Sequence, residues 1–406
     1  MRALIVITLL AACSKPNPNY CPGNPDDNCT LDADINAPQG CATAADCTNA
    51  AMPVCEPTEM ICVACTADMA GACSGMTPVC TAANTCSACV THDQCASQAC
   101  LPTGACGDDT NVAYVAASGG DTGDCTRNAP CLKITNAALK GKPYIKVMTD
   151  LDEGVVLNSA NVTILADKST SVRRTTTGAI FEIRGTSNVT IRGLTIREGL
   201  GTTGHGIMVP FGEPVNLTLD GINVIGNSGT GVIVQGGTLA VSRSVVSGNS
   251  GGGAYVNATF NITNSLFVAN GSGVSTTGGL FLTPMGNVTF KFNTVANNQA
   301  TTGAIRGINC TLAVTSTNTI VSGNDVSSGC SFEYSLFDTG TIGGTNRIGD
   351  PKFKNVMPSN PLAANYFRIQ STSAAVDNAD PASMMLTDID GDARGNAPDI
   401  GADELN

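Results

Sequence analysis

Between residues 111 and 347, apolar and polar residues alternate along short runs that are separated by Gly, Asn and Ser. In NVTIRGLTIREG (188–199), for example, the apolar side chains stand at Val189, Ile191, Leu194 and Ile196. A period of two places successive side chains on opposite faces of a strand, and Gly, Asn and Ser favour turns. The pattern predicts an all-β region of short strands, each with one buried face.

A block of two short strands, an Asn-containing turn and a third short strand recurs every 21 to 27 residues. A regular repeat of this length indicates a solenoid, in which equivalent strands stack about 4.8 Å apart. We expect the recurring amides to form a ladder inside the turns, as stacked Asn side chains do in cross-β assemblies. The marker residues are Asn227, Asn249, Asn270, Asn297 and Asn324.

Two cysteines in this region support the repeat. Cys310 precedes TLAVTS and Cys330 precedes SFEYSL, so the two residues occupy the same point of consecutive repeats. Stacking at about 4.8 Å brings equivalent Cα atoms within the range of about 4.4 to 6.8 Å that a disulfide requires. The sequence therefore predicts a Cys310–Cys330 disulfide.

The repeat resembles the right-handed parallel β-helix (solenoid) of pectate-lyase-like proteins. The segment AYVAASGGDTGDCTRNAPCLKITNAAL (113–139) is similar to the entry segment of exported β-helix proteins, in which a strand and a short helix plug the first coil. That resemblance implies a Cys125–Cys131 disulfide that pins the entry loop. We expect the β-helix to span residues 107–347.

Residues 41–106 contain twelve cysteines in three units of four, and the first cysteines of successive units are 24 residues apart. Such short units bury too little apolar surface to fold without cross-links, so we expect disulfides throughout Cys41 to Cys106, with a connectivity that the sequence does not specify. A zinc-ribbon interpretation of Cys62, Cys65, Cys86 and Cys89 is less favoured, because these CxxC pairs are the junctions between units of a longer repeat.

The N-terminus contains a short apolar run, Ala3 to Leu10, followed by Leu-Ala-Ala-Cys, which resembles a bacterial lipobox. The resemblance implies a lipoprotein signal peptide (1–12), a lipid on Cys13, and an outer-membrane lipoprotein on the cell surface of a Gram-negative bacterium. Setting Cys13 aside leaves an even eighteen cysteines, which suits an oxidising compartment. Residues 13–40 are rich in Pro, Asn and Asp and are expected to form a tether, with a local Cys21–Cys29 disulfide.

Residues 348–406 depart from the repeat and resemble the C-terminal module of bacterial surface proteins of the choice-of-anchor-Q type. Their ending, DIDGDARGNAPDIGADE, invites three interpretations: a Ca²⁺ loop, a catalytic carboxylate cluster, or a cap on the open coil. The favoured one is the cap, with Ile389, Ile400 and Ala402 covering the coil end and Arg394 pairing with a neighbouring Asp. A structural Ca²⁺ remains open, because one set of carboxylates has partial Ca²⁺-loop spacing: Asp388, Asp390, Asp392 and Asp399.

Charge and composition narrow the function. The net charge is −12, which argues against a nucleic-acid partner. No carboxylates are stacked on consecutive repeats, whereas Arg184, Arg192 and Arg197 could form a cationic strip for an anionic glycan. The competing interpretation is that these arginines pair with Glu182 and Glu198 on an exposed sheet. His205, between two glycines, is expected to be an exposed loop residue.

We therefore expect an exported, lipid-anchored, non-catalytic surface protein that serves in adhesion, glycan binding or envelope scaffolding. Its expected partners are the membrane, through the lipid, and an extracellular glycan or surface protein; no cofactor other than a possible structural Ca²⁺ is indicated, and the oligomeric state stays open. The alternative is a polysaccharide lyase or hydrolase that acts on anionic glycans.

Overall fold

The computed structural model describes residues 40–340 and 343–405. The signal peptide, Cys13, the Cys21–Cys29 pair and nearly all of the tether lie outside this part of the chain. The described residues form two compact units, one of residues 40–74 and 79–87 and the other of residues 75–78 and 88–405. The third cysteine unit therefore folds with the β-helix, and the expected domain boundary at residue 106 moves back to about residue 88.

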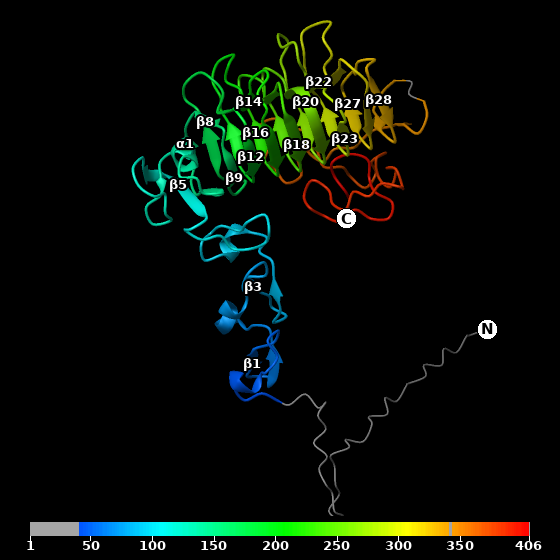
Figure 1. Cartoon of the computed structure of the whole chain (residues 1–406). Helices are drawn as coiled ribbons and strands as arrows, with labels where there is room; N and C mark the ends of the chain where they lie inside the picture. The colour runs from blue at the N-terminus through cyan, green and yellow to red at the C-terminus, as the bar shows by residue number, and fades with distance from the viewer. Residues whose placement is uncertain (1–39, 341–342, 406) are drawn as a thin grey trace, which may run out of the picture. The chain divides into compact units, whose positions relative to one another are not determined.

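Short parallel strands build the larger unit, and they stack into three sheets that wind around one core (Figure 1). Sheet 1 contains β5 (Val112–Gly120), β6 (Tyr144–Val147), β9 (Asn161–Leu165), β12 (Asn188–Arg192), β15 (Asn216–Asp220), β18 (Thr238–Ser242), β20 (Ala254–Thr263), β23 (Thr289–Lys291), β26 (Val314–Thr317) and β28 (Cys330–Glu333). Sheet 2 contains β7 (Leu151–Asp152), β10 (Ser171–Arg173), β13 (Thr195–Arg197), β16 (Asn223–Ile225), β19 (Val245–Ser247), β21 (Leu266–Val268), β24 (Thr294–Ala296), β27 (Ile320–Ser322), β29 (Leu336–Phe337) and β30 (Arg347–Ile348). Sheet 3 contains β8 (Val155–Asn158), β11 (Phe181–Arg184), β14 (Ile207–Val209), β17 (Val232–Val234), β22 (Leu280–Pro284) and β25 (Ile308–Cys310), and the long β20 joins it to sheet 1.

Each coil runs from sheet 3 through sheet 1 to sheet 2, which confirms the parallel β-helix. The register pairs Val189 with Leu217, and Leu217 with Leu239, so like residues stack inside the coil. All three are buried, as the period-two pattern predicts. A short helix, α1 (Ile134–Ala138), packs its buried Ile134 into the same core near the first coil.

A single residue with positive φ makes the bend between sheets 1 and 2. In consecutive coils this position is Gly193, Gly221 and Arg243, with φ of 68°, 63° and 50°. Gly adopts this conformation without steric cost, whereas a residue with a Cβ adopts it at some cost. The bend sits directly after the last residues of β12, β15 and β18, and it sets the positions of the charged side chains described below.

The predicted asparagine ladder is present, with one residue exchanged. Asn227, Asn249, Asn270, Asn298 and Asn324 are its members, and the Nδ2 group of each of the first four donates to Oδ1 of the next at 2.8 to 3.2 Å. Asn297 was the wrong choice, because it is exposed and makes a positive-φ bend with φ of 54°. The ladder residue is its neighbour, Asn298, which is buried.

Eight disulfides join the described cysteines. Cys310 bonds Cys330 and Cys125 bonds Cys131, the pairs expected from the sequence, with Cα–Cα distances of 5.3 and 4.7 Å. In every cysteine unit the first cysteine bonds the third and the second bonds the fourth. The four cysteines of the zinc-ribbon alternative therefore belong to four different disulfides.

The cysteine units have little regular structure beyond these bonds. In the smaller unit, two hairpins pair β1 (Val54–Glu56) with β2 (Ile61–Val63) and β3 (Val79–Cys80) with β4 (Cys86–Ser87). Short 3-10 turns lie at Ala44–Asp46, Ala67–Ala72 and His92–Gln94. No helix in the described part of the chain is long and apolar enough to cross a membrane.

The C-terminal segment lies along the side of the coil instead of closing its end, as the red segment in Figure 1 shows. Ile389 and Ala402 pack with the outward-facing Val245 and Leu266 of sheet 2. Ile400 packs with residues of β27 and β29 in a neighbouring cluster. The expectation that these side chains cap the open coil end was therefore wrong, because sheet 2 offers them an apolar outer face.

Candidate functional site: a groove beside the third cysteine unit

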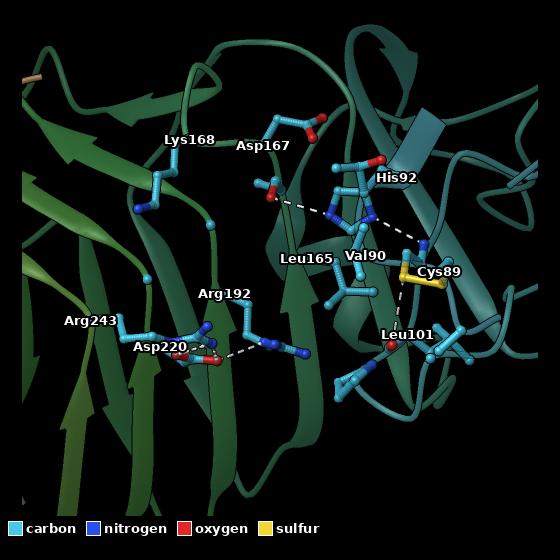
Figure 2. A pocket seen from close by; sticks show the side chains of 18 of the residues that line it. Cys89, Val90, His92, Leu101, Leu165, Asp167, Lys168, Arg192, Asp220 and Arg243 are labelled. Atoms are coloured by element: carbon cyan, nitrogen blue, oxygen red, sulfur yellow. Dashed lines mark hydrogen bonds and ion pairs between the residues drawn. A yellow bond between two sulfur atoms is a disulfide. The ribbon is translucent and has the colours of Figure 1, made fainter. Parts of the chain in front are cut away.

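A groove of about 760 Å³ lies within the larger unit, between the third cysteine unit, the side of the β-helix and the C-terminal segment (Figure 2). The third cysteine unit contributes residues 88–92 and 100–104, and the C-terminal segment contributes residues 389–390. The β-helix contributes residues 165–168, 192–193, 220–221 and 243. The groove therefore brings together parts of the chain that are far apart in the sequence.

Stacked coils place the charged side chains of the β-helix wall. Lys168 follows β9, Arg192 and Asp220 end β12 and β15 in register, and Arg243 occupies the bend after β18. Asp220 therefore lies one rung from Arg192, about 4.8 Å away along the coil axis, whereas Lys168 lies three residues past Leu165, the register partner of Arg192 on the preceding rung.

The two arginines of this wall bind the same carboxylate. Arg243 donates to both oxygens of Asp220 at 2.7 Å, and Nε of Arg192 donates to Oδ2 of Asp220 at 3.0 Å. Burial alone would raise the pKa of Asp220, but the hydrogen bonds and charge of Arg243, together with Arg192, outweigh it and lower the pKa. Asp220 is thus an ionised, fully engaged carboxylate.

Two cations of the groove keep donors that the described residues do not use. The terminal guanidinium nitrogens of Arg192 make no hydrogen bond within the described part of the chain, and in Figure 2 they point toward the third cysteine unit. Lys168 forms no ion pair with a described carboxylate, and desolvation lowers the pKa of its ammonium group. Asp390, which also lines the groove, is bound by Arg368 at 2.6 and 2.8 Å.

The opposite wall, from the third cysteine unit, carries the apolar side chains of Val90, Leu101 and Pro102 beside Thr91, His92 and Thr103. Leu101 is buried against Leu165 in a small cluster that attaches this unit to the β-helix. Val90 lies beside them in Figure 2, but its side chain is 81% exposed. The Cys89–Cys100 disulfide fixes the two segments that carry these side chains.

His92 connects the two sides of the groove. Its Nδ1 accepts a hydrogen bond from the Cys100 N–H at 3.0 Å, and its Nε2 lies 3.3 Å from the carbonyl oxygen of Ala166, to which the neutral ring donates. Burial, and secondarily the charge of Lys146, lower the pKa of His92. The neutral ring therefore fits this position best.

His205 differs from the exposed loop residue that the sequence predicted. It is half-buried instead of fully exposed, and its Nδ1 accepts a hydrogen bond from the Thr230 N–H at 3.0 Å. Burial lowers the pKa of His205 as well. It lies outside the groove, so the two histidines form a natural pair for comparison.

The structure does not bring the three predicted glycan-contact arginines together. Arg184, Arg192 and Arg197 end β11, β12 and β13, which belong to three different sheets. Arg184 pairs with Glu182 and Arg197 with Glu198, as the competing interpretation proposed. Only Arg192 lines the groove. Lys168, Arg243 and Val90 were missed, because no local sequence signal marks residues that meet only after the chain coils.

The four predicted Ca²⁺ ligands also separate. Asp388 and Asp390 have carboxylate oxygens within 4.8 Å of Asp403, whereas Asp392 and Asp399 are not members of that cluster. Asp399 instead accepts hydrogen bonds from the N–H groups of two other segments at 2.7 Å.

The clustered carboxylates already have partners within the protein. Asp388 accepts three backbone N–H groups, and Arg368 forms ion pairs with both Asp390 and Asp403. Desolvation raises the pKa of Asp403 to about 7, against the opposing charge of Arg368. Arg394 pairs with Glu404, not with the Asp that the sequence suggested. This arrangement is that of a folded structural core.

Comparisons with known proteins give limited information. Residues 17–112, which comprise the cysteine units, match a family of unknown function, DUF8331. A search of curated proteins found no match. Among solved structures, pectate lyase Pel9A is similar, with a TM-score of 0.48 and 15% identity over 73% of this chain and 96% of that chain. The fold assignment rests on the strand register itself.

Proposed function

We propose that the protein is exported, anchored by a lipid on Cys13 to the outer membrane of a Gram-negative bacterium, and displayed on the cell surface, where it binds an acidic glycan without turning it over. The observation that carries the proposal is the charge arrangement in the groove. Lys168 and Arg192 keep unused donors, while Asp220 and Asp390 are both held by arginines.

This arrangement suits binding better than hydrolysis. A glycosidase requires two carboxylates about 5 to 10 Å apart, one of which carries a proton. Asp220 is held ionised by two arginines, so it cannot serve as the acid. The unused donors of Lys168 and Arg192, in contrast, can bind the negative charges of an acidic glycan.

Export agrees with the cysteine chemistry. Eight disulfides in the described residues require an oxidising environment, and short disulfide-bonded units resist unfolding outside the cell. The lipobox-like tetrad supplies the expected membrane anchor. A rigid β-helix beyond a tether can hold a binding groove away from the membrane surface.

Binding is tested by isothermal titration calorimetry of the full chain with uronate-containing and neutral oligosaccharides of equal length. We expect binding of the acidic series only, and a loss of at least tenfold in affinity for the Lys168→Ala/Arg192→Ala double variant. Arg184→Ala is the matched control, because Arg184 lies on sheet 3 outside the groove. New reducing ends or unsaturated products would establish the lyase or hydrolase alternative instead.

Anchoring is tested separately, on the native envelope fraction. Mass spectrometry should find the mature chain beginning at an acylated Cys13, and protease added to intact cells should remove the protein. An unacylated N-terminus at Cys13 would refute the lipid anchor, and full protection from protease would refute surface display.

A further inference from the structure

Val90 is an exposed apolar side chain with no structural explanation in its own unit. It directly follows the first cysteine of the third cysteine unit, where the first two units carry Ala42 and Thr66. The third unit packs on the β-helix, and Leu101 makes that contact. Val90 does not share in it, because 81% of its side chain stays exposed.

The backbone around Val90 is fixed. The N–H groups of Val90 and Thr91 both donate to Oε1 of Gln94, at 2.7 and 3.1 Å. The Cys89–Cys100 disulfide holds the preceding residue. A backbone that is already fixed loses little conformational entropy when a ligand covers it, so Val90 is presented from a preorganised loop.

The facing wall of the groove has the opposite chemistry. In Figure 2 Arg192 and Lys168 lie on the β-helix side of the groove, and Val90 lies on the side of the third cysteine unit. A ligand that uses both walls needs a negative charge next to an apolar group. An unsubstituted acidic sugar would satisfy the cations and leave Val90 in water.

We propose that the groove selects acidic glycans whose charged sugars carry a small apolar substituent, such as an O-acetyl group, and that Val90 is the residue that reads this substituent. This inference rests on the proposed function, since it concerns the ligand of the same groove. The inference goes beyond the proposed function, because it names a substituted class of acidic glycan and the side chain that recognises the substituent.

The test compares one acidic oligosaccharide in its O-acetylated form and after mild alkaline deacetylation, by calorimetry with the full chain. We expect the acetylated form to bind about fivefold more tightly, because covering its methyl group and Val90 removes a few tens of Å² of apolar surface from water. Val90→Ser should abolish this preference, so that the acetylated and deacetylated forms bind this variant with equal affinity.

Val274→Ser is the matched control, because Val274 is 87% exposed and lies outside the groove. It should keep the fivefold preference, and all variants should keep the melting temperature of the wild type. Equal binding of both forms, or a preference that survives in Val90→Ser, overturns this inference and leaves the proposed function standing. If neither form binds, both fail.

Discussion

Removing one amide from the asparagine ladder should destabilise the β-helix, and Asn298→Ala provides the sharpest case. The Asn298 side chain makes four hydrogen bonds in a buried turn. Its Oδ1 accepts from the backbone N–H and the Nδ2 group of Asn270, and its Nδ2 donates to the carbonyl oxygen of Phe267 and to Oδ1 of Asn324. Alanine offers none of these groups.

The magnitude follows from the groups left without a partner. A hydrogen bond contributes about 1 kcal/mol net, and a buried polar group without a partner costs about 1 to 3 kcal/mol. Asn298→Ala leaves the buried backbone N–H of Asn270 without its acceptor, so we expect a loss of about 3 to 4 kcal/mol in the free energy of unfolding. For the larger unit this corresponds to a melting temperature lower by roughly 4 to 6 °C.

The neighbouring residue provides the control. Asn297 is exposed and has a positive φ of 54°, a conformation that Gly adopts freely. Asn297→Gly should therefore stay within about 1 °C of the wild type in differential scanning calorimetry with the disulfides intact. A melting temperature of Asn298→Ala equal to that of the wild type, or an equal loss in both variants, would refute the ladder argument.

Three further outcomes are expected. Burial lowers the pKa of His92 below its usual 6.5, so the stabilisation by the neutral ring is complete above about pH 6.5 and is lost as the pH falls. Between pH 7.5 and 5, the melting temperature of His92→Gln should therefore fall less than that of the wild type. The pKa of Asp403 is raised from 3.8 to about 7, so the unfolded chain releases this proton first and the stability falls as the pH rises from 4 to 7. Asp403→Asn should remove this dependence of stability on pH. Equal slopes of stability against pH in Asp403→Asn and the wild type would contradict the prediction. Replacing both Cys310 and Cys330 by Ser opens a loop of sequence separation 20 and should cost about 3 kcal/mol, measured by the melting temperature against wild-type protein with its disulfides intact; an unchanged melting temperature would contradict this.

The coil itself was accessible from the sequence, because period-two alternation and a regular repeat are local properties. Even the Cys310–Cys330 disulfide followed from the stacking distance. The error at Asn297 has an equally local origin. Two adjacent asparagines share the turn, and the sequence does not show which one makes the positive-φ bend and which one points inward.

The sequence contains a weaker indication of where the C-terminal segment lies than of the coil. Strands of sheet 2 such as Leu266–Val268 and Ile320–Ser322 are buried at every residue, which is possible only if something covers the outer face. Consecutive apolar residues in these runs were therefore a sign of a lateral cover. The sequence alone does not show that the cover is residues 348–405, because any other segment or partner could bury the same face.

The sequence by itself determined the coiled parallel strands, the cysteine repeat and the acidic net charge, since each depends on periodicity or composition. Only the tertiary structure decided the groove. Val90 and Lys168 are 78 residues apart in the chain, and they share a cavity because the third cysteine unit packs back on the coil. In the same way Arg184, Arg192 and Arg197, close in sequence, end on three sheets, because the chain changes direction between each pair.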